Sequence, residues 1–371
     1  MQKQRAGRGE TYQRVNHEVA ALITELGPGA HLPTRSELAD RFSTTRATID
    51  RVMQDFVRDG LVTGGRGRQR AVLSPTGCPI KTIGVLWNAP DRRTFMGGDY
   101  FLSLLYGIRT AAGPKMYVPV EPLQRGSCEE DIRKMGAQGL IVLRPDYCDL
   151  PTLAALSNDL GIPILTVAGS FRSKAILPSV DSNNQQGMDL AVQHLVNLGH
   201  RHIGIASVLA THPDHFERVE ACFQSLREAQ LSFLPDWLLI EPGILSKPAE
   251  ELEYEWQASI RAWLTRLIKT NRLPTAIICT DFATAVRVCT VLRENGKSVP
   301  VDVSLIHYDD PPIAVTVQPQ MTAISQDVFE LGSRALTHLV AQIQGVDVER
   351  NSRVDMTLVR PECSKPPREV P

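Results

Sequence analysis

The segment from residue 32 to residue 73 constrains this 371-residue chain more than any other. Thr34 and Glu37 form a T-x-x-E capping box, in which each side chain satisfies a backbone N–H group at the start of a helix. Thr45 is a suitable N-cap for a second helix, whose apolar residues recur at helical spacing until Gly60. The two helices should bury Leu38, Ala39, Phe42, Ile49, Val52, Met53, Phe56 and Val57. Two helices joined by a tight turn are typical of a unit that places one helix in the major groove of DNA.

A glycine-rich hairpin follows the second helix. Residues 61–63 and 70–73 are predicted to be its strands, and the glycines between them allow a tight tip. Arginines at positions 66, 68 and 70 make this tip a cationic wing: Arg66, Arg68 and Arg70. The start of the second helix is also polar, with Thr44, Thr45, Arg46 and Thr48. These side chains predict binding to the phosphates and base edges of double-stranded DNA. A winged helix used only for protein contacts is the alternative.

Residues 11–73 resemble the winged helix-turn-helix of the GntR family of bacterial regulators, whose usual pattern is LPSERELAxxxGVSRTTVRRALxxLxxEGLVxRRQGRGTFV. The resemblance implies that Thr45, Arg46 and Thr48 face base edges and phosphates, and that Arg68 enters from the wing. Arg35 and Ser36 stand where the family usually has Glu-Arg, and we count both, with Thr44, among the DNA-facing residues. Asp50 replaces an arginine of the pattern, and an aspartate there repels phosphate unless it pairs with a neighbour.

Charge is distributed unevenly along the chain. Residues 1–76 contain 12 Lys and Arg against 8 Asp and Glu, whereas the whole chain has 40 against 41. The basic excess therefore lies where the predicted DNA reader lies. Seven cysteines without C-x-x-C spacing predict buried thiols in a reducing compartment. Since we also find no apolar leader and no apolar run of membrane length, we expect a cytoplasmic protein without a membrane partner.

Beyond the turn-rich residues 74–81, which we interpret as a linker, the pattern changes to alternating strands and helices. We predict strands at 82–87, 116–120, 139–143, 162–167, 202–206, 237–240, 275–280 and 303–307, and helices at 101–111, 128–135, 150–160, 186–198, 216–229, 250–268 and 283–294. Alternating units of this kind form parallel sheets with right-handed crossovers. The predicted fold class is therefore α/β, with a winged helix-turn-helix at 1–73 and two doubly wound lobes at 82–371.

Open α/β sheets bind ligands outside the carboxyl ends of their strands. At those positions residues 81–360 resemble the LacI/GalR family, whose effector domain is periplasmic-binding-protein-like. The resemblance rests on SVDSNNQQGMDLAVQHLVNLGHRHIGIAS, on ERVEACFQSLREA and on the segment IICTDFATAVRVCTVLRENGKSVPVDVSLIHYDDPPIAVTVQPQMTAISQD. The whole arrangement is similar to arabinose-repressor-type regulators, which join a GntR-like reader to a LacI/GalR-like sensor.

The second resemblance implies that Arg218 and Asp309 hold the effector. A guanidinium fork and an acceptor carboxylate suit a polyhydroxylated ring. The alternative is that these two residues pair with each other across the cleft, and Asp281 is expected to cap the helix that it precedes. Departures from the family pattern occur at Ala168, where many members have Asp, and at Thr280 and His307, where they have Asn and Gly.

Aromatic residues near the strand ends are further candidates for effector contact, because their rings stack on the apolar face of a sugar: Trp87, Tyr100 and Phe101. For Trp87 and Phe101 plain core packing is an equal alternative. We place Thr280 in the same pocket. A metal site is not expected, since neither His200 and His202 nor His212 and His215 have carboxylate or cysteine partners at ligand spacing.

These observations predict a DNA-binding transcription regulator that responds to an effector and acts as a homodimeric repressor of sugar-utilisation genes, released by a small sugar. The dimer contact is expected in the effector domain, and no cofactor is expected. The sequence contains no phosphate-binding glycine loop and no nucleophile elbow, so we do not expect an enzyme. The alternatives are a corepressor-dependent regulator that binds a purine-like ring, a transport-type binding protein, and a sensor fold with a vestigial cleft.

Overall fold

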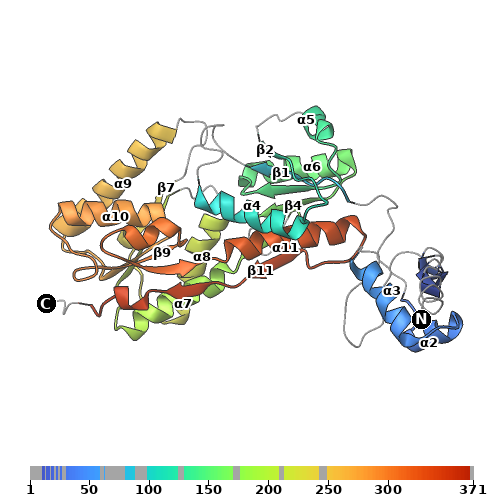
Figure 1. Cartoon of the computed structure of the whole chain (residues 1–371). Coiled ribbons are helices and arrows are strands. Elements are labelled where there is room, and N and C mark those ends of the chain that lie inside the picture. Colours follow the sequence, from blue (N-terminus) through green and yellow to red (C-terminus); the bar gives the residue numbers. More distant parts are fainter. Residues whose placement is uncertain are drawn as a thin grey trace. The chain divides into compact units, whose positions relative to one another are not determined.

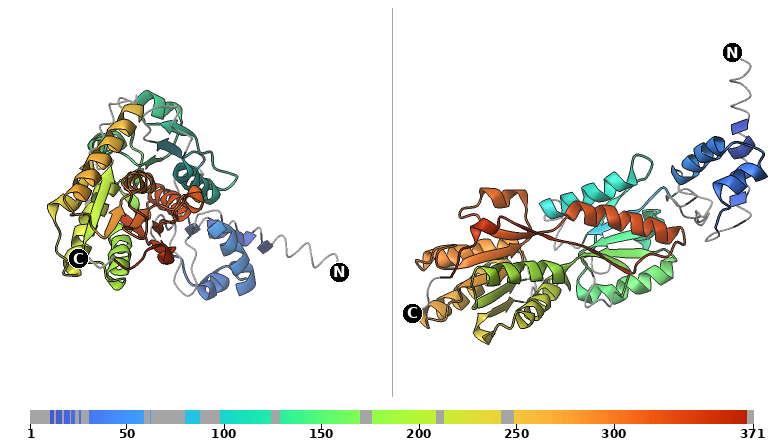
Figure 2. Two further views of the ribbon diagram at one scale, coloured as in Figure 1. Left: turned by 90° about the vertical axis from the view of Figure 1, so that its left-hand side faces the viewer. Right: turned by 90° about the horizontal axis from the view of Figure 1, so that it is seen from below.

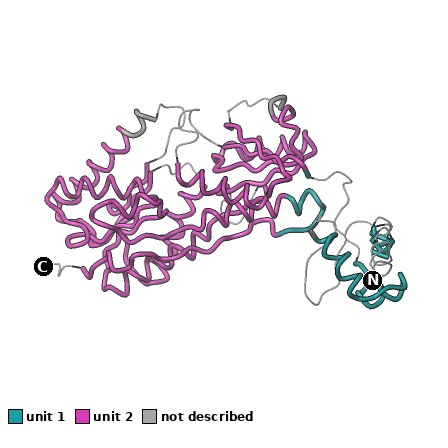
Figure 3. The backbone as a smooth tube through the Cα atoms, viewed as in Figure 1, with its two compact units in different colours: residues 1–80, 340–348 teal, residues 81–339, 349–371 magenta. Residues whose placement is uncertain are grey.

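The computed structural model describes residues 11–12, 14–16, 18–20, 22–23, 26, 31–58, 62, 80–87, 98–123, 129–169, 176–208, 213–241 and 249–367. The chain divides into two compact units (Figure 3). Unit 1 comprises residues 1–80 and 340–348, and unit 2 comprises residues 81–339 and 349–371. Most of the predicted linker at 74–81 lies outside the described residues.

Unit 1 contains α2 (Arg35–Arg41) and α3 (Arg46–Arg58), and every described residue between 11 and 26 is helical as well. The predicted capping box is present: Glu37 N–H donates to Thr34 Oγ1 at 3.4 Å, and Thr34 N–H donates to Glu37 Oε2 at 2.7 Å. At the start of α3, Thr48 N–H donates to Thr45 Oγ1 at 3.2 Å. Both predicted helix starts are therefore confirmed.

The apolar faces of the unit 1 helices meet in one buried cluster, formed by Val15, Val19, Leu22, Ile23, Leu32, Leu38, Ala39, Ile49, Val52, Met53, Phe56 and Val62. This confirms the predicted core, although Phe42 and Val57 are only half-buried against it. The helical spacing of Tyr12, Val15, Val19, Leu22, Ile23 and Leu26 predicts an apolar stripe on a helix over residues 11–26, but Leu26 at its end is exposed. Apart from Val62, the predicted wing with Arg66, Arg68 and Arg70 lies outside the described residues.

Unit 2 consists of two lobes, each built on a six-stranded sheet (Figure 1). In lobe 1 all strands are parallel, in the order β11-β5-β4-β3-β1-β2. They are β1 (Gly84–Trp87), β2 (Val120–Pro122), β3 (Leu140–Leu143), β4 (Ile164–Val167), β5 (Ser179–Ser182) and β11 (Asn351–Val354). The helices between them are α4 (Asp99–Ala112), α5 (Glu129–Lys134) and α6 (Leu150–Leu160), and α11 (Val328–Ile343) packs on α4.

Lobe 2 has the strand order β12-β10-β9-β8-β6-β7, in which only β12 is antiparallel to its neighbour. Its strands are β6 (Ile203–Val208), β7 (Leu238–Glu241), β8 (Ala276–Cys279), β9 (Ser304–Tyr308), β10 (Thr322–Ser325) and β12 (Thr357–Val359). Its helices are α7 (Asn184–Asn197), α8 (Pro213–Glu228), α9 (Ala249–Lys269) and α10 (Phe282–Glu294). Short 3₁₀ turns in unit 2 lie at Tyr147–Asp149, Pro235–Trp237, Pro312–Thr316 and Pro361–Cys363.

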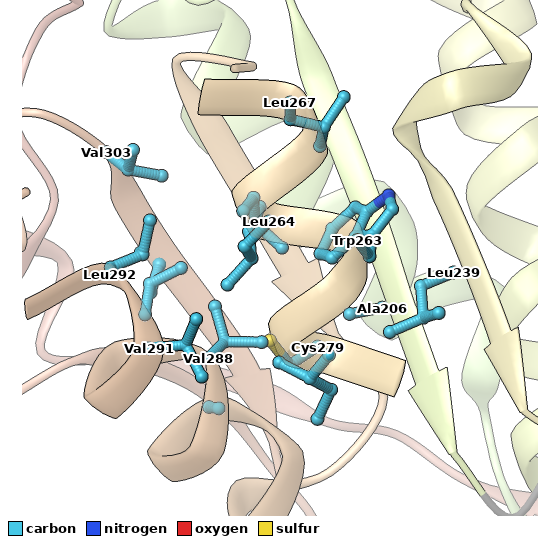
Figure 4. Close-up of a cluster of buried hydrophobic side chains, with 14 of the residues drawn as sticks. Ala206, Leu239, Trp263, Leu264, Leu267, Cys279, Val288, Val291, Leu292 and Val303 are labelled. Atoms are coloured by element: carbon cyan, nitrogen blue, oxygen red, sulfur yellow. The ribbon is translucent and has the colours of Figure 1, made fainter. Parts of the chain in front are cut away.

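Buried aliphatic side chains hold each sheet to its helices. In lobe 2 the inward faces of α9 and α10 pack on β8 and its neighbours, as Figure 4 shows for Trp263, Leu264 and Val288. In lobe 1, α4 and α11 touch backbone to backbone. A Cβ on Gly107 would lie 2.1 Å from the carbonyl oxygen of Phe329, so only glycine allows this approach.

The chain passes between the lobes three times, from β5 into α7, from β10 into α11 and from β11 into β12 (Figure 2). Hydrogen bonds tie these crossings together. Asn183 Nδ2 in the first crossing donates to Asp355 Oδ1 in the third at 2.7 Å, and the Ser182 hydroxyl donates to Gln326 Oε1 in the second. A few short connections between two rigid bodies are the usual structure of a hinge.

The predicted α/β fold with two doubly wound lobes is confirmed. The sequence pattern predicts no element beyond residue 307, so it misses β10, α11, β11 and β12. The strand expected at 116–120 is wrong: Tyr117 forms only an isolated bridge with Thr82, and β2 begins at Val120. Periodicity also failed to predict β5 (Ser179–Ser182), in which three of the four residues are polar and all four are buried. Buried strands in a parallel sheet are normally apolar, and here the polar side chains have hydrogen-bond partners: Ser179 donates to Asn351 Oδ1 at 2.9 Å, Asp181 accepts from Gly169 N–H at 2.9 Å, and Ser182 donates to Gln326.

Candidate functional site

A cavity of about 440 Å³ lies between the two lobes of unit 2. Its walls come from the starts of α4, α8, α10 and α11 and from the carboxyl ends of β3 and β9, and include Tyr100, Arg144, His215, Asp281, Phe282, Asp309, Asp310 and Gln326. The carboxyl edge of parallel sheets is where this class of fold binds ligands. The cavity is the candidate ligand site.

Arg218 on α8 organises the lobe 2 wall from behind, with only 2% of its surface exposed. Its Nη1 donates to the carbonyl oxygen of Thr280 at 2.6 Å, and its Nε donates to Asn184 Oδ1 at 3.2 Å. Its Nη2 lies 3.5 Å from Asp214 Oδ2 and 3.6 Å from Asp309 Oδ1. The guanidinium also stands 4.8 Å from the ring centroid of Tyr308. Burial tends to lower the pKa of Arg218, but Asp309 and Asp214 outweigh it and raise the pKa.

Asp309 is the residue through which this network reaches the cavity. It follows β9 directly with a positive φ of 67°, and it also accepts a hydrogen bond from the amide of Gln326. Gln326 belongs to the second crossing between the lobes, and both residues line the cavity. A ligand that contacts Asp309 would therefore also act on a hinge segment.

Arg144 faces this wall from lobe 1. It follows β3 directly, with a positive φ of 50°. Such backbone strain in a non-glycine residue costs about 1–3 kcal/mol and gathers at binding sites. Its Nη2 lies 3.3 Å from His215 Nε2 and 3.8 Å from Asp214 Oδ2, and its guanidinium stands 5.5 Å from the ring centroid of Tyr100. Arg144 thus bridges the two lobes at the cavity.

The titratable groups of the cavity have shifted pKa values. Burial lowers the pKa of His215, against the opposing effect of Asp214, so the imidazole is neutral. Its Nδ1 lies 3.1 Å from the carbonyl oxygen of Val208, which leaves Nε2 as acceptor for Arg144. Burial also raises the pKa of Tyr100, whose hydroxyl remains a hydrogen-bond donor at neutral pH. Asp281 caps α10, as predicted, by accepting from Thr284 N–H at 2.7 Å.

The predicted ligand residues take three different positions. Tyr100 and Asp309 line the cavity, while Arg218 and Thr280 lie behind its lobe 2 wall. The Thr280 hydroxyl donates to Ser207 Oγ at 3.0 Å, inside lobe 2. Trp87 and Phe101 pack on each other with ring centroids 4.7 Å apart, and Phe101 is 1% exposed in the lobe 1 core. Arg218 and Asp309 do pair, but within lobe 2 and not across the cleft.

Sequence reasoning missed Arg144, His215 and Gln326 as cavity residues. The rule that ligands bind at strand ends was sufficient to find Arg144, because it follows the strand predicted at 139–143. Gln326 lies in the last family-like segment, at the end of β10. His215 could not be found in this way, since its position depends on how α8 packs on β6.

Among the described residues of unit 1, four of the predicted DNA-facing side chains lie at or just before the start of α3: Thr44, Thr45, Arg46 and Thr48. Arg46 and Ser36 are exposed, and the hydroxyls of Thr45 and Thr48 lie 3.0 Å apart at the cap. Arg35 Nη1 lies 2.9 Å from Asp50 Oδ1, which gives the aspartate the neighbouring cation that phosphate binding would require. Both side chains are more than a third exposed, so this pair contributes at most about 1 kcal/mol.

Side chains that could bind a metal ion form hydrogen bonds within the protein instead. Asp146, Cys148 and Asp149 place ligand atoms within 4.8 Å of one another, but the two aspartates form a reciprocal capping box around a 3₁₀ turn. His200 bridges Thr275 Oγ1 and the carbonyl oxygen of Lys365, each at 2.8 Å. No helix within the described ranges combines the length and apolar character that a membrane crossing requires.

Both units of the chain match known protein families. Residues 11–72 match the gntR family of bacterial regulatory proteins, and residues 192–361 match a periplasmic binding protein-like domain. This chain joins a gntR-type helix-turn-helix domain to a periplasmic-binding-protein-like domain. The arabinose metabolism transcriptional repressor of Geobacillus stearothermophilus is similar over nearly the whole length, with 24% identity over 357 residues, 91% of this chain and 93% of that protein.

Other relatives match a shorter part of the chain. The transcriptional repressor PurR of Haemophilus influenzae is 30% identical over 230 residues, and the match spans 62% of this chain and 64% of that protein. Among solved structures, the lac repressor dimer bound to operator and the anti-inducer ONPF has a TM-score of 0.64 at 20% identity, over 76% of this chain and 94% of that one. A LacI family regulator from Enterococcus faecium with bound ribose has a TM-score of 0.60 at 22% identity, and the match covers 78% of this chain and 100% of that one. These structures establish the fold of unit 2.

Proposed function

We propose that this protein is a transcription repressor whose affinity for operator DNA is controlled by a small polar molecule bound between the lobes of unit 2. The observation that carries the proposal is the joining, in one chain, of a gntR-type reader and a two-lobed domain with a polar cavity at its hinge. The similarity to the arabinose metabolism transcriptional repressor of Geobacillus stearothermophilus, which extends over 91% of this chain, supports the proposal.

The cavity favours a sugar-like ligand. Asp309 and Gln326 supply acceptor and donor groups for hydroxyls, and the ring of Tyr100 supplies an apolar face. Sites that bind small polar ligands combine such a few placed polar groups with aromatic walls. Arg218 holds Asp309 in place rather than lining the cavity, so its role in this proposal is to position the carboxylate.

In the reader, we propose that Arg46, Thr44, Thr48 and Ser36 face DNA together with the wing arginines Arg66, Arg68 and Arg70. Arg46 is exposed at the first position of α3, the helix that follows the turn. Arg35 is tied to Asp50 and would contact phosphate as part of that pair. Thr45 serves first as the helix cap.

We further propose that two copies associate through unit 2. On lobe 1, Leu102 and Tyr106 of α4 and Phe329 of α11 are 47%, 68% and 39% exposed, and the Tyr106 and Phe329 rings stand 5.5 Å apart. Monomeric proteins seldom expose contiguous apolar patches of this kind without a partner. Light scattering should show a dimer that Tyr106→Glu shifts toward monomer, whereas Tyr117→Glu, at another exposed tyrosine, should not.

A titration of labelled genomic DNA upstream of the gene, with and without sugars, tests the main proposal. Operator fragments should bind in the nanomolar range, and one sugar class should weaken the binding by at least about tenfold. Absence of any sequence-specific DNA binding would overturn the proposal. A corepressor mechanism is the second candidate, because relatives named PurR are 30% identical over 230 residues of this chain. In that case a nucleobase would strengthen operator binding and sugars would leave it unchanged.

A further inference from the structure

The guanidinium of Arg144 has fewer hydrogen-bond acceptors around it than is usual for an arginine at a cavity. The group has five N–H donors. Its Nη2 can donate to His215 Nε2 at 3.3 Å, while Asp214 Oδ2 at 3.8 Å is too distant for a hydrogen bond. Its Nε is buried and has no hydrogen-bond partner among the described residues. The side chain is therefore held at the cavity with unused donors.

Tyr100 repeats this feature directly beside Arg144. Its ring centroid is 5.5 Å from the Arg144 guanidinium, and its hydroxyl oxygen is buried without a hydrogen-bond partner in the described part of the chain. Both residues line the cavity and both belong to lobe 1. Buried donors that stay unpaired are destabilising, so two neighbouring ones at a ligand cavity indicate an acceptor that the ligand supplies.

The carboxylates around Arg144 are already engaged elsewhere. Asp214 is shared with Arg218 at 3.5 Å, and Asp309 also pairs with Arg218. Asp310 is held by Arg360 Nη1 at 3.1 Å, and Asp281 caps α10. Asp99, the other acidic residue on the lobe 1 side of the cavity, is exposed at the first turn of α4.

Within the described part of the chain, the two residues that follow β4, Ala168 and Gly169, carry no charge. Ala168 follows this strand with a positive φ of 56° and is 6% exposed. Of the described strand ends of lobe 1, the end of β3 therefore places a cation at the cavity and the end of β4 places an apolar residue, whereas a neutral sugar is usually bound by carboxylates and amides. An arginine fork matches the two oxygens of a carboxylate or phosphate.

We propose that the ligand of this cavity carries an oxyanion, a carboxylate or a phosphate, which Arg144 and Tyr100 bind from lobe 1 while Asp309 and Gln326 bind its hydroxyl groups from lobe 2. This inference rests on the proposed function, because it specifies the class of effector for the same cavity. The ligand class is then a sugar acid or a sugar phosphate rather than a neutral sugar. Binding would satisfy the unused donors of Arg144 and draw the lobes together.

Calorimetric titration of the full chain with matched probes tests this inference. The probes are glucose, glucuronate and glucose 6-phosphate, then arabinose, arabinonate and arabinose 5-phosphate, and finally inorganic phosphate. At least one anionic probe should bind about tenfold or more tightly than its neutral counterpart. Whether the sugar acid or the sugar phosphate binds more tightly distinguishes a carboxylate ligand from a phosphate ligand. Arg144→Gln should weaken that binding about ten- to a hundredfold, and Tyr100→Phe a few-fold, as expected for lost charged and neutral hydrogen bonds. Arg227→Gln, an exposed arginine on α8, should leave it unchanged.

Three results would overturn the inference: no anionic probe binds the wild type, neutral sugars bind equally well, or Arg144→Gln binds the anion as the wild type does. If Arg144→Gln does not fold, anion binding is measured on Tyr100→Phe and Arg144→Lys instead. Tyr100→Phe keeps the aromatic ring without the hydroxyl, and Arg144→Lys keeps the positive charge without the two parallel N–H donors of the guanidinium. Operator binding is measured on the same samples. Specific operator binding without an anion preference rejects only this inference, whereas absence of operator binding rejects the proposed function.

Discussion

Replacing Arg218 by methionine should destabilise unit 2 strongly. Methionine keeps much of the aliphatic volume but removes the guanidinium that four groups share: Asn184, Asp214, Thr280 and Asp309. A single hydrogen bond to a charged group contributes about 1.5–3 kcal/mol. Removing one partner from a buried ion pair costs about 3–5 kcal/mol, because the other charge remains buried and unpaired. We expect the free energy of unfolding of unit 2 to fall by about 3–5 kcal/mol on this basis.

Tryptophan fluorescence during urea unfolding measures this change in unit 2 alone. All four tryptophans of the chain, Trp87, Trp237, Trp256 and Trp263, belong to unit 2. Arg227→Met provides the matched control, since Arg227 lies in the last turn of the same helix and is exposed. It should change the free energy of unfolding by less than about 0.5 kcal/mol. A loss below about 1 kcal/mol for Arg218→Met would refute the argument that this network stabilises lobe 2.

Four further outcomes are expected. Arg46→Ala should weaken operator binding by about 1–3 kcal/mol if the contact with a base is bidentate, and fluorescence anisotropy with operator DNA measures this. Arg68→Ala should weaken binding to all DNA sequences alike and lower the slope of log affinity against log salt by about one, so an unchanged slope would place Arg68 off the DNA. Asp309→Asn should leave operator affinity without ligand near that of the wild type and reduce the effect of the ligand on it, because a ligand shifts an equilibrium only by its difference in affinity for the two states. Burial lowers the pKa of His215, His200 and His307 below 6.5, so the unfolded chain binds these protons at a higher pH than the folded protein does. The free energy of unfolding of unit 2 should therefore fall as the pH drops below about 6.5. Urea midpoints at pH 7.5, 6.5 and 5.5 measure this, and a midpoint that does not change with pH would contradict it.

Local sequence patterns determined the helix starts of the reader. The capping box of Thr34 and Glu37, and the cap at Thr45, depend only on side chains within three residues of the backbone groups that they satisfy. Likewise α6 has the bounds predicted for it, 150–160, and Gly161 ends it in the left-handed conformation. Such short-range interactions can be predicted from sequence because no distant residue is needed to form them.

Alternation of strands and helices also determined the fold class of unit 2 and the positions of most of its strands. The order of the strands within each sheet, and the three crossings between the lobes, follow from packing that no local pattern records. The burial of β5 is an example: its polar residues are buried in a strand that pairs with β4 on one edge and with β11, more than 160 residues later in the sequence, on the other. Sequence polarity alone predicts a surface segment there.

The ligand site was likewise predicted in part from the sequence and decided in part by the tertiary structure. The strand-end rule and the family-like segments pointed to Arg218 and Asp309, and both lie in one network at the cavity. Only the tertiary structure decided that Arg218 stands behind the wall, that Phe101 belongs to the core, and that Arg144 reaches from lobe 1 toward His215. Whether a side chain faces a cavity depends on how helices from two lobes meet, and that arrangement is set by contacts between residues far apart in sequence.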